Sequence, residues 1–208
     1  MTIRVKICGI NDPVGFDTAV QAGADWIGFV FFPASPRHVT PAQAASLSAR
    51  SDAGPPLVGL FVDPTIEAIA AVLREIALDV LQLYGGAQDF SVFRKEFGLP
   101  VWRPKGIATR ADLPADTGGA DAWLLEAKPP PDATRPGGNA VRFDWSILRG
   151  WTPPAPWLLA GGLHPDNVAE AIRVTGATAV DVSSGVEGSR GVKDPDRIRE
   201  FIRNAKAA

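Results

Sequence analysis

Cys8 and Glu126 are the two residues of this chain whose side chains are best suited to exchange protons with a substrate. Each comes at the end of an expected strand: Cys8 follows Val5-Lys6-Ile7, where apolar and polar residues alternate, and Glu126 follows the apolar run Ala122-Trp123-Leu124-Leu125. A thiolate can act as a base or a nucleophile, and a carboxylic acid can act as a general acid. A lone cysteine is more often a small buried apolar residue, and a carboxylate at the end of a strand can simply be solvated. Both interpretations are therefore open for both residues.

Two glycine-rich segments in the last quarter of the chain have the composition of phosphate-binding loops. They are Ala160-Gly161-Gly162 and Ser183-Ser184-Gly185-Val186-Glu187-Gly188, and each follows an apolar stretch. Glycine lets the backbone come close to phosphate oxygens, which backbone N–H groups can bind. A glycine pair alone is usually a turn, but the loops after the last two strands of eight-stranded barrels commonly bind phosphate. The candidate phosphate-binding residues are therefore Gly161, Gly162, Ser183, Ser184 and Gly185.

Three further charged residues could contribute to a site. Lys6 precedes Cys8 by two residues and shares its face of a strand, so it could favour the thiolate or, more simply, form an ion pair inside the protein. Asp181 is the natural partner, since in a closed barrel the last strand adjoins the first. Arg37 lies in a polar loop after the second apolar stretch. It is either a surface charge or, in an active-site loop, a bidentate ligand of a carboxylate.

Eight apolar strands alternate with helical segments, which predicts a single-domain (β/α)₈ TIM barrel of the α/β class. The strands are expected at 3–9, 25–32, 57–62, 79–83, 100–105, 122–126, 157–160 and 179–183, and the helices at 13–21, 41–49, 65–77, 88–97, near 110, and at 143–148, 165–174 and 195–204. The polar face of the first strand is expected to point into the barrel, and Trp26 and Trp123 to face the helices. A doubly wound open sheet is the alternative.

One long loop interrupts this regular alternation. It covers 127–141 and contains four prolines and the pair Gly137-Gly138. Loops of this length are usually functional lids or disordered. No linker follows or precedes it, so residues 1–208 are expected to form one domain.

The composition excludes several classes of protein. The chain has 208 residues, 46% of them hydrophobic, and a net charge of -2, and the absence of a basic stripe argues against nucleic-acid binding. Its single cysteine cannot form an internal disulfide, which favours a reducing, cytoplasmic location. No stretch approaches the about 18 apolar residues of a membrane span, so no membrane association is expected.

Several stretches taken together resemble the phosphoribosylanthranilate isomerase family of tryptophan biosynthesis. Each stretch is modest alone, but they occur in the expected order from one end of the chain to the other. They are VKICGI (5–10), GFVFFPASPRHV (28–39), LVGLFVDP (57–64), LQLYG (81–85), FDW (143–145), LAGGLHPDNV (159–168) and VDVSSGVEGSRGVKD (180–194).

The resemblance implies an isomerase that needs neither metal nor cofactor and acts on a small phosphorylated substrate. The sequence leaves a monomer and a homodimer open. The expected reaction opens the ribosylamine ring of N-(5′-phosphoribosyl)anthranilate and rearranges the aldose amine to a ketose. The resemblance makes Cys8 the general base and Glu126 the general acid. It assigns Arg37 to the anthranilate carboxylate, Asp181 to the ribose hydroxyls and the two glycine-rich loops to the phosphate.

The chain departs from the family pattern at two positions. Glu126 stands where the family has aspartate, and Tyr84 stands where the family usually has histidine. Because about 1 Å of misplacement can cost about 100-fold in rate, the longer Glu126 requires the carboxyl or the substrate to shift. Tyr84 is interpreted as loop packing. The alternatives are a barrel that binds a phosphorylated ligand with weakened or lost catalysis, and another sugar-phosphate isomerase; related barrels that act on histidine intermediates use an aspartate where this chain has Cys8.

Overall fold

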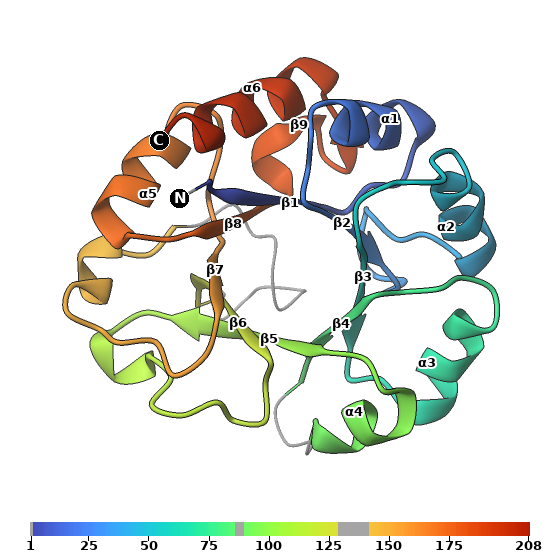
Figure 1. Ribbon diagram of the computed structural model, residues 1–208, viewed down its shortest axis with the longest axis horizontal. Coiled ribbons are helices and arrows are strands. Elements are labelled where there is room, and N and C mark those ends of the chain that lie inside the picture. The colour runs from blue at the N-terminus through green and yellow to red at the C-terminus, as the bar shows by residue number, and fades with distance from the viewer. Residues whose placement is uncertain (1, 86–89, 129–141) are drawn as a thin grey trace.

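Eight parallel strands form a closed barrel at the centre of the computed structural model, which describes residues 2–85, 90–128 and 142–208 (Figure 1). Each strand pairs with the next, and β8 pairs with β1, so the predicted barrel is confirmed and the open sheet is excluded. The strands are β1 (Arg4–Cys8), β2 (Trp26–Val30), β3 (Leu57–Val62), β4 (Val80–Tyr84), β5 (Val101–Ile107), β6 (Ala122–Ala127), β7 (Trp157–Leu159) and β8 (Ala179–Val182).

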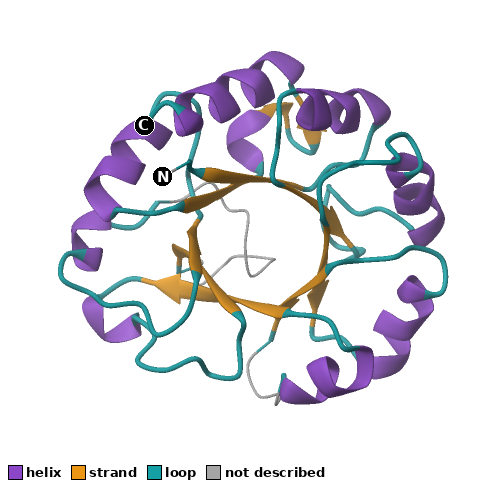
Figure 2. Ribbon diagram, in the orientation of Figure 1, coloured by secondary structure: helices purple, strands orange, loops and turns teal. Residues whose placement is uncertain are grey.

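The α-helices surround this barrel on its outer side (Figure 2). They are α1 (Pro13–Gln21), α2 (Pro41–Ser48), α3 (Ile66–Leu73), α4 (Ser91–Phe97), α5 (Val168–Thr175) and α6 (Pro195–Lys206). Short 3₁₀ helices, η1 (Arg110–Asp112) and η2 (Trp145–Leu148), lie between β5 and β6 and between β6 and β7. Side chains next to the helix N-termini determine where α1 and α2 begin. Asp12 caps α1 by accepting a hydrogen bond from the backbone N–H of Gly15, and Thr40 forms a capping box with Gln43 at the start of α2. Most of the expected loop 127–141 lies outside the described residues.

Strand alternation divides the apolar residues into an outer and an inner cluster. The outer cluster joins the barrel to the helices and includes Ile7, Phe29 and Trp123, the last as expected. The inner cluster fills the barrel and includes Trp26 and Trp102, whose ring centroids lie 5.2 Å apart. The expectation that Trp26 faces the helices is therefore wrong. β2 is apolar on both faces, so its composition carries no parity signal.

A small antiparallel hairpin follows β8 and was not expected from the sequence. It consists of β9 (Glu187–Ser189) and β10 (Val192–Lys193), and the 3₁₀ helix η3 (Ser184–Val186) connects it to β8. In Figure 1 the hairpin lies beside β1 and α1. The second glycine-rich segment is thus a turn of helix followed by a strand rather than a simple loop. No helix among the described residues has the length and apolarity to cross a membrane.

Candidate active site

A buried ion pair joins the first and last strands inside the barrel. Lys6 Nζ on β1 lies 2.7 Å from Asp181 Oδ1 on β8, and the two residues are register partners. The lysine side chain is fully buried. Burial lowers the pKa of Lys6, but Asp181 and Cys8 outweigh this effect, so the pKa is raised overall and the ammonium stays charged. The expected pairing of Lys6 with Asp181 is thus present.

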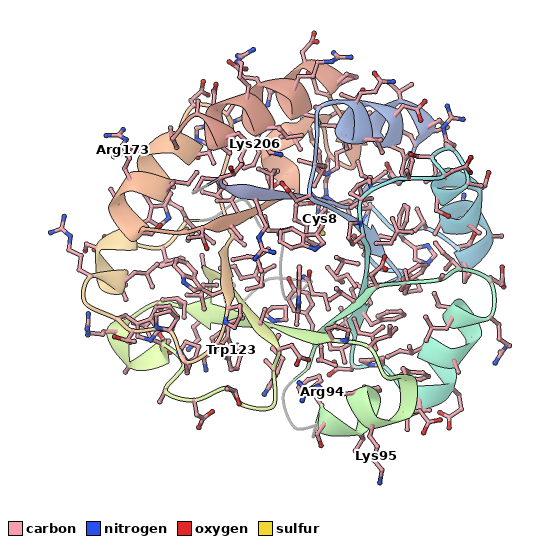
Figure 3. The ribbon with its side chains drawn as sticks, in the orientation of Figure 1. Cys8, Arg94, Lys95, Trp123, Arg173 and Lys206 are labelled. Carbon is pink, nitrogen blue, oxygen red and sulfur yellow. The ribbon has the colours of Figure 1, made fainter. Side chains whose placement is uncertain are left out.

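Cys8 is the last residue of β1, and its side chain lies within the ring of strands, whereas Lys95 and Arg173 project outward (Figure 3). Its register partner on β2 is Gly28. A Cβ atom at residue 28 would lie 3.0 Å from both Cys8 Sγ and Lys6 Nζ, so a glycine is needed there to leave room for both groups. Burial raises the pKa of the Cys8 thiol, and the Lys6 ammonium offsets this only in part. Cys8 is therefore a neutral thiol at pH 7.

Glu126 faces into the barrel near the end of β6 and is buried. Its register partner on the neighbouring strand is Gly106, which has no side chain to fill the inward position of β5. The next strand, β4, ends in Tyr84, whose buried phenol is close enough to the Glu126 carboxyl group for that group to raise the pKa of the phenol. A tyrosine on one strand thus reaches a carboxylate two strands away.

Tyr84, expected in the loop after the fourth strand, is instead the last residue of that strand. It packs with Cys8 inside the barrel as well as contacting Glu126. Burial raises the pKa of the phenol well above its usual value, and the neighbouring carboxyl groups of Glu126 and Asp181 raise it further. The phenol therefore stays protonated and is available as a hydrogen-bond donor beside Glu126. Strand parity from Val80 could have placed Tyr84 in the interior.

The two glycine-rich segments lie against each other and against the strand that carries Glu126. A Cβ atom at Gly185 would lie 1.8 Å from the carbonyl oxygen of Leu163, so the segment after β8 packs tightly on the segment after β7. Gly161, with φ +79°, packs on β6, where its Cβ atom would lie 2.9 Å from the backbone nitrogen of Ala127. Only glycine fits these contacts without strain. The two candidate phosphate loops thus form one surface beside Glu126.

Arg37 is buried rather than a solvated surface charge. Its guanidinium forms a bidentate ion pair with Glu187 at the start of β9, with Nε 2.5 Å from Oε1 and Nη2 3.1 Å from Oε2. Glu187 also pairs with Lys193 on β10. The sequence motifs contain Glu187 and Lys193 but indicate no role for either residue. No local sequence signal identifies either one, because their partners come from the loop after β2 and from the hairpin.

Among the described residues, no group of three or more histidine, cysteine, aspartate and glutamate side chains is arranged to hold a metal ion. The polar groups gathered at this end of the barrel are instead a thiol, carboxylic acids, a phenol and cations. These groups can donate and accept protons and can bind anions. The arrangement is therefore suited to acid–base chemistry on a negatively charged substrate.

Comparison with known proteins identifies the family. The family model described as N-(5′-phosphoribosyl)anthranilate (PRA) isomerase matches residues 5–204. A relative from Acidiphilium cryptum, named N-(5′-phosphoribosyl)anthranilate isomerase, is 54% identical over 205 residues, covering 99% of each chain. The crystal structure of phosphoribosyl anthranilate isomerase from Thermotoga maritima has a TM-score of 0.84 and 36% identity, covering 99% of this chain and 100% of that one.

One solved relative is a complex with a ligand. It is a phosphoribosyl anthranilate isomerase bound to reduced 1-(o-carboxyphenylamino)-1-deoxyribulose 5-phosphate, with a TM-score of 0.81 and 34% identity over 99% of this chain and 100% of that chain. The full-length match in sequence, the shared barrel and the ordered motifs all agree. The chain belongs to the phosphoribosylanthranilate isomerase family, the aldose–ketose isomerases of tryptophan biosynthesis.

Proposed function

We propose that Glu126 and Cys8 are the general acid and the general base of the family reaction in this chain. That reaction converts N-(5′-phosphoribosyl)anthranilate to 1-(2-carboxyphenylamino)-1-deoxyribulose 5-phosphate, an Amadori rearrangement. The observation that carries the proposal is that the two side chains enter the same end of the barrel interior, from β6 and β1, beside the paired glycine-rich loops. A substrate held by its phosphate at those loops would lie between an acid and a base.

The proposed chemistry depends on two proton transfers between the protein and the substrate. Glu126 protonates the ring oxygen of the ribosylamine, and the C1–O bond breaks to give an open, protonated Schiff base. Cys8 loses its thiol proton to solvent and, as the thiolate, removes the proton from C2, which gives an enolamine. Protonation of the enolamine at C1 and loss of the C2 hydroxyl proton then give the ketone. The atoms balance without an external oxidant, because the oxidation at C2 is matched by the reduction at C1. No cofactor is required by this scheme.

The raised pKa of the Cys8 thiol is compatible with this role if the substrate helps to ionise it. The Schiff base carries a positive charge next to the C2 proton, and a nearby cation favours a thiolate. Lys6 already provides one positive charge beside the sulfur. Cys8 would then become an effective base only when the ring has opened, so proton removal follows protonation by Glu126.

Binding of the substrate is assigned to groups around this pair. Arg37 binds the anthranilate carboxylate, since Nη1 of its guanidinium takes no part in the ion pair with Glu187. Asp181 contacts the ribose hydroxyls through Oδ2, because Oδ1 accepts the hydrogen bond from Lys6. The phosphate is bound by Gly161, Gly162, Ser183, Ser184 and Gly185, whose segments form one surface.

The remaining proposals concern the domain organisation, the cellular location and the oligomeric state of the enzyme. The eight strands of the barrel run from residue 4 to residue 182 and close on one another, which supports a single domain over 1–208. We place the chain in the cytoplasm, as a monomer or homodimer that binds neither nucleic acid nor membranes. A related isomerase from Thermotoga maritima is described as dimeric, which supports the homodimer.

The experiment that tests the proposed function is an activity assay on the unaltered chain. The fluorescence of phosphoribosylanthranilate should disappear on addition of catalytic amounts of the protein, with EDTA present to remove metal ions. Loss of fluorescence only in proportion to the amount of protein would indicate a binding protein without turnover, and would contradict the proposal. A substrate of the histidine pathway serves as the negative control for the other class of sugar-phosphate isomerase.

A further inference from the structure

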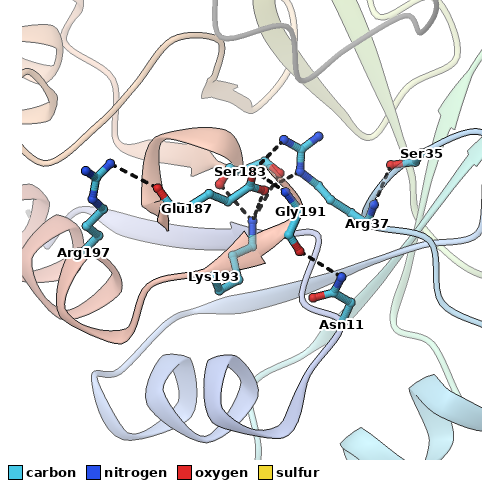
Figure 4. A network of polar contacts seen from close by, with 8 residues as sticks. All are labelled: Asn11, Ser35, Arg37, Ser183, Glu187, Gly191, Lys193 and Arg197. Carbon is cyan, nitrogen blue, oxygen red and sulfur yellow. Dashed lines mark hydrogen bonds and ion pairs between the residues drawn. The ribbon is translucent and has the colours of Figure 1, made fainter. Parts of the chain in front are cut away.

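Glu187 occupies a central place in a buried polar network that the proposed reaction does not use. Its carboxylate accepts four hydrogen bonds, two from Arg37, one from the backbone N–H of Gly191 at 2.9 Å and one from Lys193 Nζ at 3.1 Å (Figure 4). Its backbone carbonyl also accepts a hydrogen bond from Arg197 at 3.1 Å. A carboxylate with this many partners has one fixed orientation, so it can define where its partners lie.

The arginine in this network is confined on two sides. A Cβ atom at Gly9, directly after β1, would lie 2.5 Å from Arg37 Cδ. A Cβ atom at Gly191 would lie 2.7 Å from the carbonyl oxygen of Pro36. The end of β1 and the hairpin therefore both pack closely against the loop that carries Arg37. The ion pair with Glu187 then fixes the direction in which the Arg37 guanidinium points.

Lys193, the lysine in this network, also forms hydrogen bonds with the second candidate phosphate loop. Lys193 Nζ donates to the backbone carbonyl of Ser183 at 2.9 Å and lies 3.4 Å from Ser183 Oγ. The lysine side chain is fully buried. Through Arg37 and Lys193, the Glu187 carboxylate therefore connects the loop after β2 with the loop after β8. Arg37 and Ser183, in these two loops, are assigned to opposite ends of the substrate.

The charges of this network do not balance. Glu187 supplies one negative charge, whereas Arg37 and Lys193 supply two positive charges, and all three side chains are buried. A buried group of charges with a surplus of one sign is stabilised by a ligand of the opposite sign. A substrate with a carboxylate and a phosphate has the sign that this surplus requires.

We infer that Glu187 is a positioning residue for substrate recognition: it orients Arg37 toward the anthranilate carboxylate and holds Lys193 against Ser183 of the phosphate loop. This inference rests on the function proposed above, which assigns Arg37 and Ser183 to the substrate. Glu187 itself does not contact the substrate. Its effect is on the affinity and the selectivity of binding, and the proton transfers at Cys8 and Glu126 do not depend on it.

The test compares two substrates that differ only in the group Arg37 is assigned to bind. They are N-(5′-phosphoribosyl)anthranilate and N-(5′-phosphoribosyl)aniline, which lacks the carboxylate. In Glu187→Gln, the KM for the first substrate should rise about tenfold to a hundredfold, as expected for loss of a charged hydrogen bond. Its KM for the second should change much less, and kcat on the carboxylated substrate should stay within about threefold, because uniform binding affects KM alone.

A double-mutant cycle separates positioning from a purely structural role. Arg37→Ala should raise the KM for the carboxylated substrate in the unaltered chain but add little in the Glu187→Gln background, since residues that act through each other are not additive. Glu187→Asp, which keeps the charge but is one methylene shorter, should show an intermediate loss of selectivity. Inhibition by inorganic phosphate should weaken in Glu187→Gln if Lys193 is released from Ser183.

The matched control is Asp121→Asn, which removes the ion pair between Asp121 and Arg94 on the outer side of the protein. It should lower thermal stability without changing either KM. A KM for the carboxylated substrate that stays within about twofold in Glu187→Gln, or fully multiplicative effects in the cycle, would overturn the inference. If Arg37→Ala raises KM and Glu187→Gln does not, only this inference fails. If Arg37→Ala also has no effect on KM, the proposed role of Arg37 fails with it.

Discussion

Tyr84 and Glu126, the two residues that differ from the motifs expected from the resemblance to the family, interact inside the barrel. The Tyr84 phenol on β4 and the Glu126 carboxyl group on β6 interact across the inward position that Gly106 leaves open on β5, and this interaction raises the pKa of the phenol. Glutamate is longer than the family aspartate, and tyrosine is larger than the family histidine. The two changes therefore affect the same contact. This relationship is not apparent when each position is considered alone.

This contact predicts non-additive effects of reverting the two residues to the family pattern. Glu126→Asp alone should lower kcat/KM because the shorter acid loses its partner, and Tyr84→His alone should lower it as well. The double variant should recover part of the loss, since residues in contact couple by about 0.5 to 3 kcal/mol. The measurement is kcat/KM for all four proteins, with Tyr84→Phe as the control that keeps the ring and removes the hydroxyl. Purely multiplicative effects would show that the two residues act independently.

Removal of either proton-transfer group should nearly abolish the reaction. Cys8→Ala and Glu126→Gln should each lower kcat by about a hundredfold or more, which is the usual contribution of a general base or acid. Steady-state fluorescence assays give kcat, and circular dichroism shows whether each variant is folded. Turnover at the normal rate by a folded variant of either residue would refute the role assigned to it.

The raised pKa of the Cys8 thiol predicts that its thiolate forms mainly above neutral pH. Burial raises the pKa of Cys8, so the thiolate fraction should grow by up to about tenfold per pH unit as the pH rises toward that pKa. The pH dependence of kcat/KM does not isolate this change, because Glu126 must stay protonated to act as the general acid. The rate of alkylation of Cys8 by iodoacetamide between about pH 6 and pH 9 follows the thiolate alone. An alkylation rate that is already constant with pH at neutrality would contradict the raised pKa.

The lowered pKa of Lys193 predicts that the free energy of unfolding increases with pH in the alkaline range. Burial lowers its pKa from 10.5 to about 8 in the folded protein, although Glu187 opposes the shift. Between these two values the unfolded chain binds a proton that the folded protein does not, so the free energy of unfolding rises with pH there. The gain is at most about 3 to 4 kcal/mol, from a pKa difference of about 2.5 units at about 1.4 kcal/mol per unit.

Replacement of this lysine should remove that gain. Urea unfolding of the chain with Lys193 and of Lys193→Met, from pH 7 to pH 10, gives the free energies to compare. Titration of Cys8 also changes stability at high pH and depends on the Lys193 charge, so both proteins carry Cys8→Ala. The difference between their curves then reports Lys193. Curves that stay parallel across this range would contradict the lowered pKa.

Gly185 should be sensitive to even the smallest side chain. A Cβ atom there would lie 1.8 Å from the carbonyl oxygen of Leu163, and the backbone on both sides would have to move. Gly185→Ala should therefore weaken inhibition by inorganic phosphate about tenfold, since overpacking costs about 1 to 3 kcal/mol. Gly188→Ala is the matched control in the same segment, because its Cβ atom would come no closer than 3.6 Å to another group. Equal effects of the two substitutions would argue against a phosphate site at Gly185.

The amino-acid sequence by itself determined the local structure of this protein. The third strand covers Leu57–Val62 as expected, and Asp12 and Thr40 cap the helices that follow them in the chain. These features depend on alternation and capping, which act between residues close in sequence. The alternation of eight strands with helices was enough to predict the barrel and to bring Cys8 and Glu126 to the same end of it.

The tertiary structure decided which side chains meet there. Lys6 and Asp181 are 175 positions apart, and Arg37 and Glu187 are 150 apart, so only closure of the barrel and the docking of the hairpin bring them together. The inward direction of Trp26 was also beyond the sequence, because a strand that is apolar on both faces has no polar face to mark its orientation. Neighbours in space depend on strand order and packing, whereas neighbours in sequence fix only the local conformation.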